Sequence, residues 1–255
     1  RQVLFAEEDV GKAKALAARD HLVKINSDVE IKAHVEDLHF TNIEKLLKGA
    51  TIIIDGTDNL ETRFLINEYS LKHHIPWVYG AAIQDRGFVA AFSGKSPCFQ
   101  CVVKEARALG TCDTIGVINS ITSLIGSLQV AECLKVILGK PTAGMVHAQL
   151  MTTRFDILKI TKNSSCTACQ GNYDHLEGRK GQHVIRFCRT GQFQIFSSRP
   201  LDLPPIKKQL QKAGNVKDLG FCLIFNNMKI FKDRVLILAA TEQEAKSLYA
   251  RYIGN

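Results

Sequence analysis

The sequence predicts an α/β fold with a mostly parallel, twisted sheet, followed by a small C-terminal α+β domain. Two observations predict it. Short apolar strand patterns alternate with helical patterns in the first two thirds of the chain, and further strand patterns gather in the last third. A length of 255 residues suits two domains, which we expect at 1–172 and 177–255.

Periodicity defines the elements of the first domain. Apolar residues at helical spacing predict helices over residues 12–25, 41–48, 60–73 and 115–138. Strand patterns occur over residues 29–35, 51–55, 77–79 and 88–92, with one or two closing strands within 145–159. The β-branched run Thr51–Asp55 predicts a strand buried on both faces. The helix at 115–138 is apolar almost all round, which predicts burial in the core or in a dimer interface.

The last third of the chain predicts a compact module beyond a polar loop at 162–172. We expect strands at 184–187, 193–196, 221–225 and 235–238, with helices at 205–213 and 241–252. The net charge of +8 lies entirely here, since residues 1–176 hold 19 Lys+Arg and 19 Asp+Glu, whereas 177–255 hold 14 and 6. This excess indicates either an acidic partner surface, of a protein or a nucleic acid, or a solvated face without a partner.

Composition argues against several classes of protein. The nearest approach to an 18-residue uncharged apolar run, Ile115–Val130, is interrupted by polar side chains, so we expect no membrane span. No basic-then-apolar leader follows Arg1, which favours a cytoplasmic protein. The basic residues lack interleaved aromatic residues for base stacking, so we do not expect a nucleic-acid partner.

Four of the eight cysteines form two C-x-x-C pairs, Cys98 with Cys101 and Cys166 with Cys169. Each pair lets two thiolates from one turn reach the same metal, so two pairs predict a closed, structural zinc site with four cysteine ligands. Redox-active or simply buried pairs are the alternatives.

Two further patterns carry possible chemistry. Asp55-Gly-Thr-Asp58-Asn59 follows an expected strand, where open α/β sheets bind nucleotides, although Asp and Asn there are often turn formers. Cys112 precedes the long helix, whose dipole can acidify a thiol, although a single cysteine is usually inert. Arg1 and Lys14 indicate nothing alone.

Together these motifs occur in one order: Arg1-Gln-x-Leu, Val10-Gly-x-x-Lys14, Asp55-Gly-Thr-Asp58-Asn59-x-x-x-Arg63, Tyr79-Gly-Ala-Ala82, Pro97-Cys-x-x-Cys101, Thr111-Cys112 and the second cysteine pair. This order closely resembles the ThiF/MoeB/HesA family of adenylyltransferases, relatives of the ubiquitin-activating enzymes. The resemblance spans residues 1 to about 170 and implies a Rossmann-like sheet. The C-terminal module is similar to an extra domain of some bacterial members.

The resemblance implies an enzyme that uses ATP and Mg²⁺ to adenylate the C-terminal glycine of a ubiquitin-like sulfur carrier ending in Gly-Gly. Thiamine, molybdopterin or a related sulfur pathway would be served, by a homodimer. Asp58 looks like the essential aspartate for magnesium-ATP, and Lys14 and Arg1 like the phosphate contacts. Gln2, Asn59 and Arg63 lie in the same motifs and are expected at the nucleotide. Cys112 matches the cysteine that forms a sulfur link in thiamine-type members.

One departure affects activity. The family begins with a strand, a Gly-rich turn and an acidic ribose-binding residue, all before the position of Arg1, so we expect the 255-residue fragment alone to be inactive or poorly folded. The alternative function is a non-catalytic, zinc-stapled scaffold that binds a ubiquitin-like partner. A nicotinamide-dependent oxidoreductase would need a Gly-rich strand-turn-helix motif that the sequence does not contain.

Overall fold

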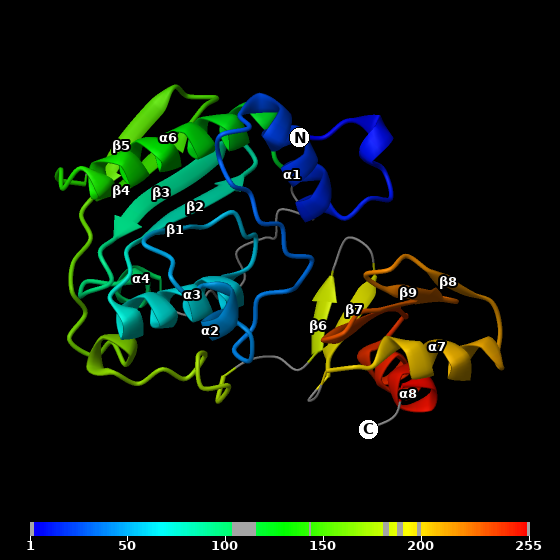
Figure 1. Cartoon of the computed structure of the whole chain (residues 1–255). Helices are drawn as coiled ribbons and strands as arrows, with labels where there is room; N and C mark the ends of the chain where they lie inside the picture. The colour runs from blue at the N-terminus through cyan, green and yellow to red at the C-terminus, as the bar shows by residue number, and fades with distance from the viewer. Residues whose placement is uncertain are drawn as a thin grey trace. The chain divides into compact units, whose positions relative to one another are not determined.

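The computed structural model describes residues 3–103, 116–142, 144–180, 184–187, 191–197 and 200–253. The chain forms two compact units, which are described separately (Figure 1). The first contains Arg1–Phe5 and Leu38–Gly181, and the second contains Ala6–Asp37 and Gln182–Asn255. The domain limits 1–172 and 177–255 remain a prediction.

The first unit is built on a five-stranded sheet in the order β1-β2-β3-β4-β5. Its strands are β1 (Ile53–Ile54), β2 (Trp77–Ile83), β3 (Arg86–Phe92), β4 (Met145–Gln149) and β5 (Arg154–Leu158). Its helices are α2 (Ile43–Leu46), α3 (Leu60–His73), α4 (Phe99–Val102), α6 (Asn119–Ile137) and the 3-10 turn η2 (Ala168–Gln170).

The α/β class is confirmed, and the sheet is mixed. Among the described strands only β1 and β2 pair in parallel, whereas β2 to β5 pair antiparallel. The expected mostly parallel pairing fails where connections are short. Only Gln84 and Asp85 separate β2 from β3, and a two-residue connection can join only antiparallel strands. The connection between β4 and β5 is also short, since only residues 150–153 separate these two strands.

Helices α3 and α6 lie on opposite faces of this sheet (Figure 1). The face with Trp77 and Tyr79 packs against α3, and the alternate residue Val78 faces α6. Helix α6 approaches closely because two strand residues have no side chain. A Cβ on Gly80 would lie 2.3 Å from Gln129 Cδ, and a Cβ on Gly87 would lie 2.4 Å from Ile125 Cγ1.

Helix α6 buries one side and exposes the other. Ile121, Ile125 and Cys133 are buried against the sheet, whereas Val130 and Leu134 are 54% and 52% exposed. Within the residues described, α6 is also the one helix long and apolar enough to cross a membrane by length and composition. The core helix of a soluble protein passes the same test.

Two of the strand predictions made for residues 1–172 were wrong. No strand forms over 29–35, because an alternating pattern needs a hydrogen-bonding neighbour and this stretch pairs with none of the described strands. Strand β1 is not buried on both faces, since Ile54 is 51% exposed. The reason is that β1 is an edge strand among the described strands.

The second unit has a six-stranded antiparallel sheet in the order β6-β7-β11-β10-β9-β8. Its strands are β6 (Val184–Phe187), β7 (Gln192–Phe196), β8 (Val216–Asp218), β9 (Leu223–Phe225), β10 (Met228–Ile230) and β11 (Arg234–Leu238). Helices α7 (Leu203–Gln211) and α8 (Glu242–Tyr252) pack on one face of it. The unit also contains η1 (Glu7–Asp9) and α1 (Lys14–Ile25).

Candidate functional site

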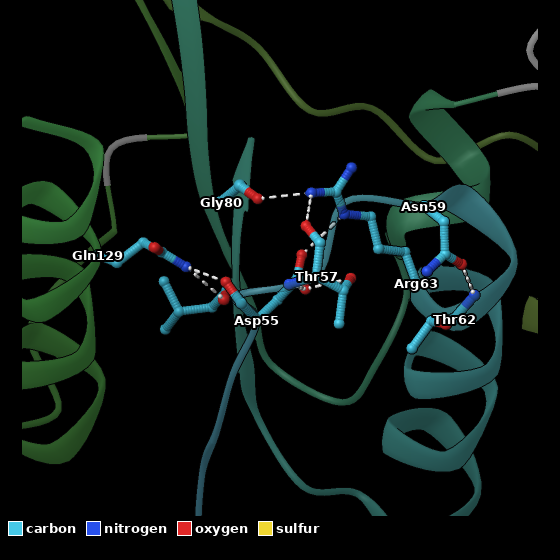
Figure 2. Close-up of polar contacts among 8 residues, drawn as sticks. Asp55, Thr57, Asn59, Thr62, Arg63, Gly80 and Gln129 are labelled. Carbon is cyan, nitrogen blue, oxygen red and sulfur yellow. Dashed lines mark hydrogen bonds and ion pairs between the residues drawn. The ribbon is translucent and has the colours of Figure 1, made fainter. Parts of the chain in front are cut away.

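The carboxyl end of β1 leads into a loop that is tied down by its own first residue. Asp55 is only 1% exposed, and its Oδ1 accepts hydrogen bonds from the Thr57 amide at 2.7 Å and the Thr57 hydroxyl at 2.6 Å (Figure 2). An aspartate that bonds two residues ahead closes a tight turn. Asp55 therefore shapes the loop and is not available to a ligand.

Arg63, on the first turns of α3, completes the ionic pairing of Asp55. Its Nε donates to Asp55 Oδ2 at 2.9 Å, and its Nη2 donates to the Gly80 carbonyl at 2.9 Å and to the Thr57 carbonyl (Figure 2). The residue is 7% exposed. A buried charge is tolerated when it is paired and hydrogen-bonded in this way.

Tyr79 lies beneath the guanidinium, with Arg63 Cζ 5.0 Å from the ring centroid. Burial raises the pKa of the Tyr79 hydroxyl, so the ring stays neutral and available for a cation–π contact. Arg63 is thus directed into the protein, and its expected place at the nucleotide stays a prediction.

Gln129 of α6 fixes the same loop from the other side of the sheet. Its Nε2 donates to the Asp55 carbonyl at 2.7 Å and to the Val78 carbonyl at 3.3 Å (Figure 2). This role was missed in the sequence, where Gln129 is only a polar interruption of an apolar helix. The signal that could have found it is a glutamine predicted on the buried face of a helix, since a buried amide needs partners.

Asp58 and Asn59 lie at the exposed end of this loop. Asn59 is the N-cap of α3, and its Oδ1 accepts from the Thr62 amide at 2.8 Å (Figure 2). Asp58 precedes the cap, and its carboxylate has no hydrogen bond or ion pair with the part of the chain that the structure describes. Of the acidic groups in this motif, Asp58 is the one whose carboxylate is open to solvent.

The described structure does not test whether the remaining predicted nucleotide and sulfur residues lie near Asp58. Lys14 is the first residue of α1 and belongs to the second unit, whereas Asp58 belongs to the first. Arg1, Gln2 and Cys112 lie outside the described residues. Their grouping with Asp58 remains a prediction.

The four paired cysteines converge in the first unit. Cys98 and Cys101 flank the start of α4, and Cys166 and Cys169 flank the start of η2. The sulfur separations are 3.9 Å for Cys98–Cys101 and 3.7 Å for Cys98–Cys166. They are 3.5 Å for Cys101–Cys169 and 3.3 Å for Cys98–Cys169. Four sulfurs around a tetrahedral zinc at about 2.3 Å would lie about 3.8 Å apart, so the cluster fits that ion.

The cluster is also protected from solvent. Cys98 is 1% exposed, and burial raises the pKa values of the Cys98 and Cys166 thiols. Buried sulfurs favour the neutral thiol unless a cation compensates the thiolate charge. A closed group of four sulfurs leaves no coordination position for substrate, so any role of a metal here is structural.

Helix α3 joins this cluster to the loop of Asp58. Its first turns hold Arg63, and its later turns hold Glu68, which is buried and accepts from the His175 and Leu176 amides at 2.8 and 2.9 Å. Leu71 of the same helix packs against the cysteines. One helix therefore fixes both features of the first unit.

Comparisons with known proteins agree with this architecture. The model of the ThiF family matches residues 1–168. A Bacillus subtilis protein named sulfur carrier protein ThiS adenylyltransferase is 31% identical over 100% of this chain and 81% of its own length. A Thermus thermophilus sulfur carrier protein adenylyltransferase is 34% identical over 66% of this chain and 67% of its own length.

Among solved structures, Escherichia coli MccB with ATP superposes with a TM-score of 0.56 over 67% of this chain. The sequence identity is 19%, so this likeness shows the fold alone, and the chain spans 55% of that protein.

Proposed function

The chain belongs to the ThiF family, and from that premise we propose that it transfers an adenylyl group from ATP to the C-terminal glycine of a ubiquitin-like sulfur carrier. A carboxylate oxygen of the carrier forms a bond to the α-phosphorus of ATP. The bond between this phosphorus and the oxygen that bridges the α- and β-phosphates breaks. Pyrophosphate leaves, and the carrier ends in an acyl-adenylate. The observation that carries the proposal is the open carboxylate of Asp58 at the carboxyl end of the parallel pair β1 and β2, where α/β sheets bind nucleotides.

We propose that Asp58 provides an oxygen ligand for Mg²⁺, because exposed carboxylates suit this ion and Asp58 has no competing described partner. Bound Mg²⁺ would supply charge neutralisation at the phosphates. Arg1, Gln2 and Lys14 are proposed as further nucleotide contacts on the motif alone. Asn59 supports the site as the cap of α3, and Arg63 supports it by holding Asp55 and Thr57.

We propose that Cys98, Cys101, Cys166 and Cys169 hold one Zn²⁺ that fastens two segments distant in sequence. The matching sulfur separations and the burial of Cys98 support this assignment. Cys112 is proposed to act after adenylation, with its sulfur attacking the acyl carbon and AMP leaving.

We also propose a cytoplasmic homodimer. The exposed apolar side of α6 supports this, because Val130 and Leu134 would be buried against a second copy. The Bacillus relative, which aligns over the whole chain, favours the carrier of thiamine biosynthesis over that of molybdopterin.

The test is ATP–pyrophosphate exchange, with candidate carriers ending in Gly-Gly, by a protein in which the family's N-terminal strand and Gly-rich turn precede these 255 residues. Exchange that depends on the carrier, together with a carrier mass increased by one adenylyl group, is the expected result. Carrier binding without exchange would instead establish a non-catalytic scaffold. A covalent carrier adduct that disappears in Cys112→Ser would support the later sulfur step.

A further inference from the structure

Asn67 lies on α3 between the loop of Asp58 and the cysteine cluster, and it is 1% exposed. Its Oδ1 accepts from the backbone amide of Phe99 at 2.9 Å, and its Nδ2 donates to Cys98 Sγ at 3.6 Å. Both contacts are buried. Phe99 directly follows Cys98, so one side chain holds the backbone and the sulfur of a single predicted ligand.

The orientation of this amide follows from its partners. A backbone N–H can only donate, so the amide oxygen of Asn67 must face Phe99. The NH2 group is then directed to the sulfur of Cys98. The donor at the sulfur is therefore fixed by the neighbouring hydrogen bond.

Charge explains why such a donor matters. Four thiolates carry four negative charges, and one divalent cation leaves two of them uncompensated. Inside a protein, excess charge is costly unless N–H donors approach it. Groups that hydrogen-bond a metal ligand orient that ligand, and their loss typically lowers metal affinity about 10- to 100-fold.

We propose that Asn67 is a positioning residue for the cysteine cluster: its amide holds Cys98 in place and stabilises the thiolate of that residue in the metal-bound form. The inference rests on the zinc site proposed above. It assigns to the middle of α3 a role in metal retention that no motif of the sequence indicated.

The experiment compares Asn67→Asp and Asn67→Leu with the unchanged protein. Aspartate keeps an oxygen for the Phe99 amide but removes the N–H donor, and leucine removes both contacts. Gln100→Ala is the matched control, because Gln100 lies between Cys98 and Cys101 in the sequence. Its side chain also bonds to α3, with Nε2 donating to Glu68 Oε1 at 3.1 Å, but it makes no hydrogen bond to a described sulfur. Zinc content is measured by mass spectrometry, and zinc release by competition with 4-(2-pyridylazo)resorcinol.

Both Asn67 variants should bind zinc about 10- to 100-fold more weakly, while Gln100→Ala should match the unchanged protein. After Co²⁺ substitution, the thiolate-to-cobalt absorption band should move to lower energy in both Asn67 variants, because a sulfur without its hydrogen bond is a better electron donor. A purely structural role of Asn67 would not move this band.

Unchanged zinc affinity and an unchanged cobalt band in Asn67→Asp would overturn the inference. Unfolding of that variant in saturating Zn²⁺ would overturn it too, since Asn67 would then serve the fold and not the metal. Failure of the unchanged protein to bind Zn²⁺ or Co²⁺ would instead refute the proposed zinc site itself.

Discussion

Two neighbouring aspartates at the end of β1 have different tasks because of their surroundings. Asp55 is buried and shapes the loop with Arg63 and Thr57, whereas Asp58 is exposed at its tip. The loop gains its rigidity from hydrogen bonds that Asp58 does not make.

Asp58→Asn should therefore lower carrier adenylation about 100-fold or more, since a neutral amide is a poor ligand for a cation beside phosphates. The exchange rate and the melting temperature are the two measurements. The melting temperature should stay unchanged, because the side chain has no described partner within the chain. An active Asp58→Asn protein would remove Asp58 from the mechanism.

Arg63→Met should instead act through stability. Removing the guanidinium leaves Asp55 charged and buried, and breaking such a pair costs about 3–5 kcal/mol. Urea denaturation measures this loss. Arg19→Met is the control, because the Arg19–Asp20 pair is largely exposed and should contribute less than about 1 kcal/mol. Equal stability of the two variants would show that the Asp55 pair is not needed by the fold.

At the scale of the element, α6 combines two surfaces. One side packs against Gly80 and Gly87, and the other exposes Val130 and Leu134. The apolar character of this helix therefore exceeds what the sheet alone requires.

If that exposed side is a dimer interface, Leu134→Lys should produce a monomer, because a lysine cannot be buried there without a partner charge. Analytical ultracentrifugation at micromolar concentration measures the change. Ser120→Lys, at an exposed polar position near the start of the same helix, should leave the dimer intact. Dimers that persist in Leu134→Lys would place the interface elsewhere.

At the scale of the whole molecule, the two units carry separate cores, and the single tryptophan reports on one of them. Trp77 is fully buried in the first unit and packs against Phe99, next to Cys98. The second unit has its own core between its sheet and helices α7 and α8.

Removing zinc with a chelator should therefore unfold the first unit selectively. We expect the midpoint temperature of the unfolding transition followed by Trp77 fluorescence to fall by about 10 °C or more, since a structural metal contributes several kcal/mol to the free energy of unfolding. The unfolding transition of the second unit, followed by circular dichroism, should keep the same midpoint temperature. Re-addition of Zn²⁺ is the control. A fluorescence transition that ignores the chelator would contradict a structural metal.

Features that depend on short segments could be predicted from the amino-acid sequence. The helix over 60–73 appears with those bounds as α3, and both C-x-x-C pairs could be recognised because two ligands from one turn have a fixed spacing. The order of the motifs was enough to recognise the family. The short strands β8 and β10 were not predicted, because a periodic pattern cannot be recognised in three residues.

The different roles of the polar residues near β1 could not be predicted, because they depend on contacts made in the folded protein. The motif alone does not distinguish the roles of its polar residues, which are Asp55, Asp58, Asn59 and Arg63. In the folded protein Asp55 and Arg63 are buried, whereas Asp58 is exposed to solvent. Gln129 reaches the same loop from a helix 74 residues away. Such contacts depend on which segments the sheet brings together, and the spacing of residues within one segment does not predict this.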